Sequence, residues 1–299
     1  MARTRVLSGI GRTALALAVA GVLFLVGRSN AHDLGRVHLR LEAGWLLASI
    51  PLYAIASLCL AVGWDAELAA FGHRLRLVTA VRVWWRAQLA RYVPTGLAAF
   101  ASRAALARNE GVPASLGAAS LAVELACLIG WGSLIAAVGV PSSLLSTPGR
   151  LVLGIGAAGG LASLPVLYPR LAGLTKRFST LANLECDRPR LYLAEGWYGV
   201  SVAVKSVAFV VFAAALTSVH LGDAWLLSGG VQGAAVVGII GITPAGLGVR
   251  ETAMVGLLSH RLGTADAAAL AVAWRAYEFA FELAWLGLGT VWKEKAPVA

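Results

Sequence analysis

Long apolar stretches separated by short, basic segments run through most of the chain. About seven of these stretches are candidate membrane-spanning helices, because roughly 20 apolar residues in helical conformation cross the hydrocarbon core of a bilayer. They cover residues 13–27, 44–63, 114–139, 151–167, 192–216, 224–242 and 265–292. The pattern predicts an all-α fold, a polytopic transmembrane helix bundle in which residues 1–299 form a single integral membrane domain.

The first stretch, residues 13–27, is the shortest and follows a basic start. It is either a retained first helix, with the N-terminus in the cytoplasm, or the apolar part of a signal peptide that ends near residue 31. We favour the retained helix, because the rest of the chain gives no reason for secretion. The arginine-rich loops at 64–113 and 168–191 are then cytoplasmic, as the positive-inside rule requires, although three arginines within residues 28–40 depart from it.

Two segments inside the apolar pattern do not look like ordinary spans. Proline and glycine interrupt the chain at Pro94-Thr95-Gly96-Leu97 and again at Pro244-Ala245-Gly246-Leu247-Gly248. Irregular backbone at membrane depth is tolerated only where it is buried in protein or lines a cavity. Residues 77–90, before the first break, carry two arginines on one helix face, and residues 249–260 form a short helix after the second. We therefore expect two broken or re-entrant helical segments, and the side of the C-terminus depends on whether they cross.

The two breaks occupy equivalent places in the chain. Each follows a predicted span and precedes a span with a central carboxylate, Glu124 in one case and Glu278 with Glu282 in the other. Broken helices at corresponding positions of an internal repeat point to the substrate site of a transporter. We therefore predict approximate repeat halves at residues 1–168 and 190–295. A chance match is the alternative, since the chain is rich in Gly, Ala and Leu.

A helix break also offers a binding site for an anion. The new helix N-terminus has unsatisfied amides and a partial positive charge, and a guanidinium can hold a phosphate through two parallel hydrogen bonds. The predicted headgroup-binding residues are Arg91, Pro94, Gly96, Arg103, Pro244, Gly246, Gly248, Arg250 and Glu251. The alternative is that Glu251 only complements the helix dipole and that Arg250 snorkels to the interface.

Ionisable residues also occur deep inside the predicted spans, where each costs about 2.5–3.5 kcal/mol at a helix centre on insertion scales. They can converge inside the bundle and either balance one another or carry protons for coupling. These intramembrane charges are Glu124, Lys205, Arg275, Glu278 and Glu282. Structural pairing without a transport role is the alternative. Glu195 is close to Trp197 and Tyr198, which predicts a position at the membrane interface.

Composition narrows the functional classes. The chain is 59% hydrophobic and 13% charged, with a mean hydropathy of +0.76, and no polar block is large enough for a soluble enzyme domain. The net charge of +10 comes from 25 Lys and Arg against 15 Asp and Glu, and it gathers beside the spans, which argues against nucleic-acid binding. The three cysteines and five histidines show neither a disulfide framework nor the spacing of metal ligands. We expect no metal, no cofactor and no catalytic residue.

At these residues the chain resembles the lysylphosphatidylglycerol synthase/flippase transmembrane family. The late signature of that family, Pro-Gly-Gly-x-Gly-x-x-Glu before an apolar helix, is similar to residues 244–251, with alanine in place of one glycine. An early signature, a Leu-Pro-x-x-x-Gly-like break followed by an arginine and a basic patch, looks like residues 92–113. Glu124 matches part of a Leu-Glu-Arg motif in which Leu125 replaces the arginine, and the arginine of the last helix matches Arg275.

The resemblance implies a protein that moves or handles the headgroup of an anionic lipid, a phospholipid or a polyprenyl phosphate, across the cytoplasmic membrane. We therefore expect a multi-pass, flippase-like lipid transporter without the soluble aminoacyl-transferase domain that some members carry. Membrane lipids are its expected partners, and a second copy of the chain or a lipid-modifying enzyme are candidates for further ones. The alternatives are a membrane enzyme of polyprenyl-phosphate chemistry or a non-transporting accessory protein of cell-envelope lipid metabolism.

Overall fold

The computed structural model describes residues 40–88, 98–174, 186–241 and 243–291, and every regular element in these residues is helical. The α-helices are α2 (Ala43–Ala70), α3 (Leu77–Gln88), α4 (Ala98–Arg108), α5 (Ala114–Gly139), α6 (Thr147–Leu174), α8 (Arg188–Leu216), α9 (Ala224–Ile240), α10 (Val249–Leu262) and α11 (Thr264–Val291). Short 3₁₀ turns, η4 (Leu221–Asp223) and η5 (Pro244–Gly246), precede α9 and α10. The expected all-α bundle is confirmed. The first predicted span, residues 13–27, lies outside the described residues.

The helices follow the apolar pattern closely. Four of them, α2, α5, α6 and α8, are long and apolar enough to cross a membrane. Helix α9 is a shorter apolar helix, and α11 has the length of a span but carries Arg275, Glu278 and Glu282. These are the lengths and compositions expected of a multi-pass membrane protein.

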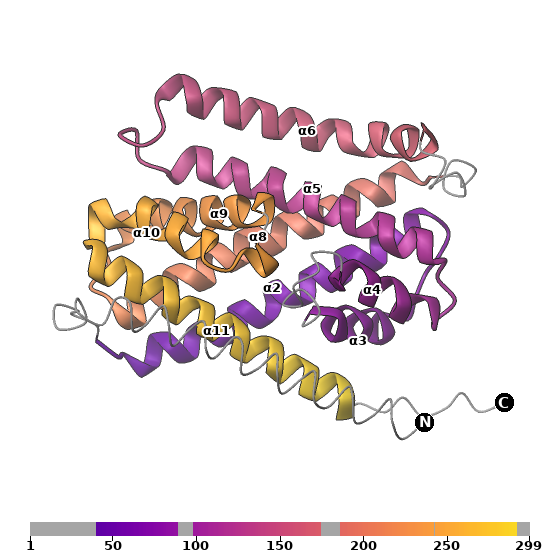
Figure 1. Cartoon of the computed structure of the whole chain (residues 1–299), viewed down its shortest axis with the longest axis horizontal. Coiled ribbons are helices and arrows are strands. Elements are labelled where there is room, and N and C mark those ends of the chain that lie inside the picture. The colour runs from indigo at the N-terminus through magenta and orange to yellow at the C-terminus, as the bar shows by residue number, and fades with distance from the viewer. Residues whose placement is uncertain (1–39, 89–97, 175–185, 242, 292–299) are drawn as a thin grey trace.

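Helices α2 and α8 pack against each other in antiparallel orientation within the bundle (Figure 1). Backbone hydrogen bonds join their ends: the N–H of Arg40 donates to the carbonyl of Leu216, and the N–H of Asp187 donates to that of Ala70, both at 2.9 Å. Gly63 permits the close approach, since a Cβ atom there would lie 3.1 Å from the ring of Tyr198.

The chain turns back on itself at the second break. Arg261, near the end of α10, forms an ion pair with Asp223, just before α9, with Nε and Oδ1 2.9 Å apart. Figure 1 shows α9 and α10 side by side, and they pack directly on each other. Helix α9 has 17 residues, about 25 Å at 1.5 Å per residue, which is less than the roughly 30 Å of a bilayer core. Residues 224–240, most of the predicted span 224–242, are thus one arm of a helical hairpin.

Helices α3 and α4 form the corresponding hairpin in the first half. Arg82 of α3 contacts Glu110, just after α4, with Nη2 and Oε1 3.5 Å apart. The break between these helices, with Pro94 and Gly96, lies outside the described residues. The α3–α4 hairpin follows α2, and the α9–α10 hairpin follows α8. Because α2 and α8 are antiparallel, the two hairpins enter the bundle from opposite faces.

Helix α11 then crosses the whole bundle. It starts directly after α10, and near its other end the ring of Trp285 stacks on that of Trp85 in α3, with the ring centroids 4.0 Å apart. The end of α11 therefore lies at the same face as α3 and the start of α8.

The order of the described α-helices is the same in residues 43–139 and 188–291: a long helix, two shorter helices and a second long helix. With opposite hairpin directions, this is the arrangement of an inverted repeat. The predicted boundaries of the halves, residues 1–168 and 190–295, stay a prediction.

Candidate functional site

The second break is a true interruption of the helix. Ala245, Gly246 and Gly248 all have positive φ angles, of 53°, 69° and 80°. A left-handed conformation is unfavourable for alanine, so the surrounding contacts hold this residue in place. Gly246 lies against α9, where an added Cβ atom would be 2.9 Å from the carbonyl oxygen of Gly238. The break is therefore built into the packing of the hairpin.

Glu251 and Arg275 fasten the break from two sides. The N–H of Gly248 donates to Oε2 of Glu251 at 2.7 Å, so Glu251 caps the start of α10. Nη2 of Arg275 donates to the carbonyl of Ala245 at 2.9 Å, and its Nε lies 3.5 Å from Oε1 of Glu251. The capping role considered for Glu251 is thus present, and Arg275 connects the cap to α11.

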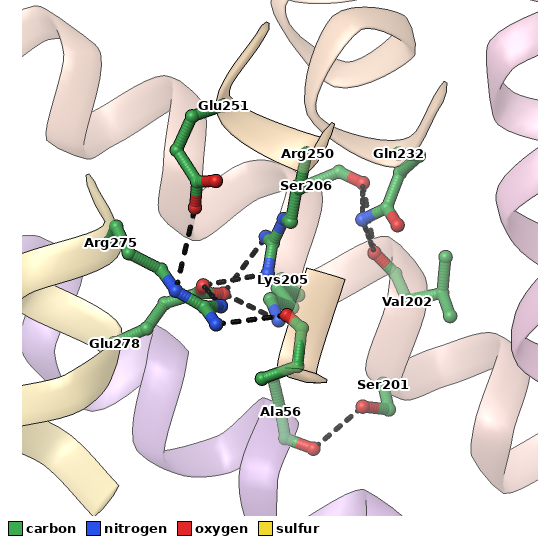
Figure 2. Close-up of polar contacts among 11 residues, drawn as sticks. Ala56, Ser201, Val202, Lys205, Ser206, Gln232, Arg250, Glu251, Arg275 and Glu278 are labelled. Atoms are coloured by element: carbon green, nitrogen blue, oxygen red, sulfur yellow. Dashed lines mark hydrogen bonds and ion pairs between the residues drawn. The ribbon is translucent and has the colours of Figure 1, made fainter. Parts of the chain in front are cut away.

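Arg250 points into the bundle and not toward the interface. Its side chain is buried and forms a two-pronged contact with Glu278, at 2.8 and 3.1 Å (Figure 2). Nζ of Lys205 lies 2.7 Å from Oε1 of Glu278, and Nη1 of Arg275 lies 3.5 Å from Oε2. The interpretation that Arg250 snorkels outward is therefore wrong, because Glu278 binds its guanidinium inside the protein.

A similar pair stands in the first half. Arg103 of α4 contacts Glu124 of α5 through both of its terminal nitrogens, one of them at 3.4 Å from Oε1. The indole N–H of Trp84 donates to the same carboxylate at 3.2 Å, and the guanidinium also lies 5.5 Å from the Trp84 ring centroid. In both halves, an arginine on the short helix after the break binds a glutamate on the long helix that follows.

A cavity of about 340 Å³ lies between these two pairs. Its volume falls in the usual range of small-molecule pockets. The charged residues in its lining are Arg103, Glu124, Lys205, Arg250, Arg275 and Glu282. Glu278 is not among the lining residues, so the three cations that it binds lie at the cavity wall with this carboxylate behind them. Gly241, Thr243, Ala245 and Gly246 bring the break itself to the wall.

Several polar residues of this cavity were not singled out from the sequence. Nε2 of Gln232 on α9 donates to Oγ of Ser206 at 2.9 Å and to the carbonyl of Val202 at 3.1 Å (Figure 2). Ser201 donates to the carbonyl of Ala56 at 2.7 Å. Gln232 offered a signal, since it is a lone amide in an apolar helix. Ser201 and Ser206 gave no comparable signal in the sequence.

Two further buried glutamates lie outside the cavity lining. Glu195, predicted at the membrane interface, is buried, because α5 packs on this part of α8 and Trp131 donates its indole N–H to the carbonyl of Glu195. Glu67, which follows the predicted span 44–63, is completely buried in the last turns of α2. The predicted site residues Arg91, Pro94 and Gly96 lie outside the described residues. Within the described ranges, no group of three or more His, Cys, Asp or Glu side chains could hold a metal ion.

The fold and the cavity define a multi-pass helical membrane protein with a charged interior pocket beside a helix break. A family model described as "Lysylphosphatidylglycerol synthase TM region" matches residues 12–285. The chain therefore belongs to this family, and it is a membrane protein connected with lipids. Searches of curated proteins and of solved structures gave no match.

Proposed function

We propose that the protein is a flippase-like transporter, and that its cavity receives the phosphate headgroup of an anionic lipid, a phospholipid or a polyprenyl phosphate. The observation that supports this most is the placement of the four cations of the lining at one cavity, with Glu278 outside the lining. A phosphate that enters can accept charge-assisted hydrogen bonds from these side chains and from amides near the break.

The two hairpins favour transport over simple binding. Transporters with inverted repeats place their substrate between discontinuous helices and expose it to one face and then to the other. Apolar residues, among them Leu121, Leu125 and Ile239, form much of the remaining lining. In this proposal the headgroup occupies the cavity while the acyl chains stay in lipid. The protein lies in the cytoplasmic membrane with its N-terminus in the cytoplasm, and we assign it no catalytic step.

The test is transfer of lipid between leaflets in reconstituted vesicles. Fluorescent phosphatidylglycerol in the outer leaflet is measured with an impermeant quencher, and we expect the wild-type protein to accelerate its exchange. Arg250→Ala should remove most of this activity, because it deletes a cation of the cavity wall. Arg261→Ala is the matched control: it lies on the same helix, but its ion pair with Asp223 is outside the cavity.

Two further arms identify the ligand. A phosphatidylcholine analogue of zero net charge should move more slowly, and soluble glycerol phosphate should compete if the phosphate alone is recognised. Arg250→Lys, which retains the charge, should keep part of the activity, and a monodisperse size-exclusion profile of Arg250→Ala would show that its loss of activity is not misfolding. Equal exchange by wild type and Arg250→Ala would contradict the site. Binding without exchange would indicate a non-transporting accessory protein, and a new product formed from a lipid phosphate would indicate an enzyme.

A further inference from the structure

Glu67 is a buried carboxyl group that the cavity does not use. It lies in the last turns of α2 with an exposed fraction of 0%, and it is not a lining residue. Its Oε2 atom accepts a hydrogen bond from the hydroxyl of Tyr198 on α8 at 2.9 Å. Its Oε1 atom has no hydrogen-bond partner in the described part of the chain. A buried carboxyl group with a single hydroxyl partner in an apolar cluster is energetically costly, which points to a functional role.

The surroundings of Glu67 disfavour its ionised form. Trp64, Leu116 and other fully buried apolar side chains form the cluster around Tyr198. Removing a carboxylate from water costs several kcal/mol unless a cation and further hydrogen bonds compensate it. The neutral acid avoids this cost and leaves one proton stored inside the protein.

The titratable and charged groups that face Glu67 come from four helices. They are Tyr198 of α8, Glu124 and Cys127 of α5, Arg103 of α4 and Tyr168 of α6. Arg103 is the cation of this set. Within the described residues, Arg103 is thus the charged group that can stabilise an ionised Glu67, against the burial of the carboxyl group and the negative charge of Glu124.

Arg103 also stands at the cavity. It contacts Glu124, lines the cavity together with Glu124, and lies 5.7 Å from the ring centroid of Trp64, one turn before Glu67 on α2. Arg103 binds Glu124 and also acts on Glu67 through its charge. An anion that binds Arg103 from the cavity side adds a negative charge beside this same guanidinium. A ligand in the cavity and a proton on Glu67 are thus connected through one side chain.

We propose that Glu67 and Tyr198 form a proton-binding site whose occupancy is linked to the binding of an anionic headgroup at Arg103. The inference rests on the proposed function, since the headgroup is the anion that reaches this cavity. While the cavity is empty, Arg103 can compensate part of a negative charge on Glu67, and the proton leaves to water more easily. When a phosphate occupies Arg103, that compensation is lost and Glu67 retains or takes up a proton.

This linkage determines how the affinity for the headgroup depends on pH. Headgroup and proton each strengthen the binding of the other, because coupling between two sites is reciprocal. Headgroup affinity is therefore highest at low pH and falls as the pH rises and Glu67 loses its proton in the empty protein. For one linked proton the dissociation constant rises at most about tenfold per pH unit. Proton uptake on binding also offsets the charge that the headgroup brings into the membrane.

The test is equilibrium binding of short-chain phosphatidylglycerol to the detergent-solubilised protein between pH 5.5 and 9.5. Its phosphodiester keeps one negative charge throughout, so a pH dependence belongs to the protein. We expect the wild-type dissociation constant to rise with pH. Glu67→Gln, which is always neutral, should keep the low-pH affinity over the whole range. In weak buffer with a pH dye, binding should take up protons in wild type and clearly fewer in this variant.

Glu195→Gln is the control, since Glu195 is also buried with an unsatisfied carboxylate oxygen but, unlike Glu67, is not among the groups that Arg103 faces. It should behave as wild type. Infrared difference spectra of the wild type should also show a protonated carboxyl group that responds to lipid, and this measurement needs no variant.

A pH-independent wild type, or a Glu67→Gln variant with the wild-type pH dependence, would overturn the proton site while the headgroup site stands. Absence of saturable binding of both short-chain phosphatidylglycerol and a short-chain polyprenyl phosphate at every pH would overturn the proposed function itself, and the linkage with it.

Discussion

Glu278 binds three cationic side chains in the interior of the bundle. Its two oxygens contact Arg250, Lys205 and Arg275, at distances from 2.7 to 3.5 Å. Each charge would be expensive alone at this depth, and together they neutralise and hydrogen-bond one another. The cations are thereby fixed at the cavity wall before any ligand arrives. Preorganised charges of this kind bind an anion without first having to be ordered.

Replacing Glu278 should therefore be costly. Glu278→Gln leaves three cations without their common carboxylate, and we expect a loss of about 3–5 kcal/mol in folding free energy. The double variant Glu278→Gln with Arg250→Gln should lose less than the sum of the single variants, because one of the uncompensated charges is gone. Thermal unfolding in detergent measures both.

The exposed pair between Asp223 and Arg261 provides the comparison. Asp223→Asn should cost less than about 1 kcal/mol, since a solvent-accessible ion pair contributes little. Equal losses for Glu278→Gln and Asp223→Asn would contradict the structural role of the Glu278 cluster.

At the scale of elements, the hairpin of α9 and α10 depends on the backbone of its break. Three residues there have positive φ angles, and Gly246 touches the carbonyl of Gly238 across the hairpin. The shape of the turn, together with the cap by Glu251, decides where α10 starts and hence where Arg250 points. The position of the charge cluster therefore depends on the geometry of the helix break.

Gly246→Ala tests this dependence. The new methyl group would meet the Gly238 carbonyl at 2.9 Å in a conformation already unfavourable for alanine, so we expect a loss of about 1–3 kcal/mol and impaired lipid exchange. Ala245→Gly at the adjacent residue should be tolerated, because it relieves a left-handed alanine. Thermal unfolding and the exchange assay together check both variants. A Gly246→Ala protein as stable and active as wild type would show that the break is not under this constraint.

At the scale of the whole molecule, two faces can be told apart. One carries the turn between α5 and α6 together with the ends of α8 and α10. The other carries the α3–α4 hairpin, the start of α8 and the end of α11. Described arginines of the basic segments, among them Arg74, Arg76 and Arg188, belong to the second face, so the positive-inside rule predicts that this face is cytoplasmic.

Cysteine labelling in intact cells tests this orientation. In a chain with Cys186 replaced, Ser143→Cys in the α5–α6 turn should react with an impermeant maleimide from outside. Asn109→Cys after α4 should react only once the cells are permeabilised. Both positions are exposed, and Cys59 and Cys127 are buried. The reverse pattern would invert the topology, and labelling of both sites from outside would contradict the bundle.

Most of the helices could be predicted from the sequence, because a membrane span is visible locally as a long stretch of apolar residues. The predicted span 114–139 coincides with α5, and the break at Pro244–Gly248 is where the backbone leaves the helix. The end of α2 was harder to predict. Charged residues after Gly63 suggested that the span was over, but the helix continues to Ala70 because α8 covers Glu67 there. Burial by a distant helix has no local signal.

By itself, therefore, the sequence determined an all-helical membrane protein with a helix broken at Pro244–Gly248 and charges that had to meet inside the bundle, while the first break at Pro94–Gly96 stays a prediction. Only the tertiary structure decided which charges meet: Arg103 with Glu124, and Arg250, Lys205 and Arg275 with Glu278. It also decided that Arg250 turns inward and that Glu67 and Glu195 are buried. The physical reason is that helix formation depends on neighbours along the chain, whereas the cost of a buried charge is met by partners from other helices.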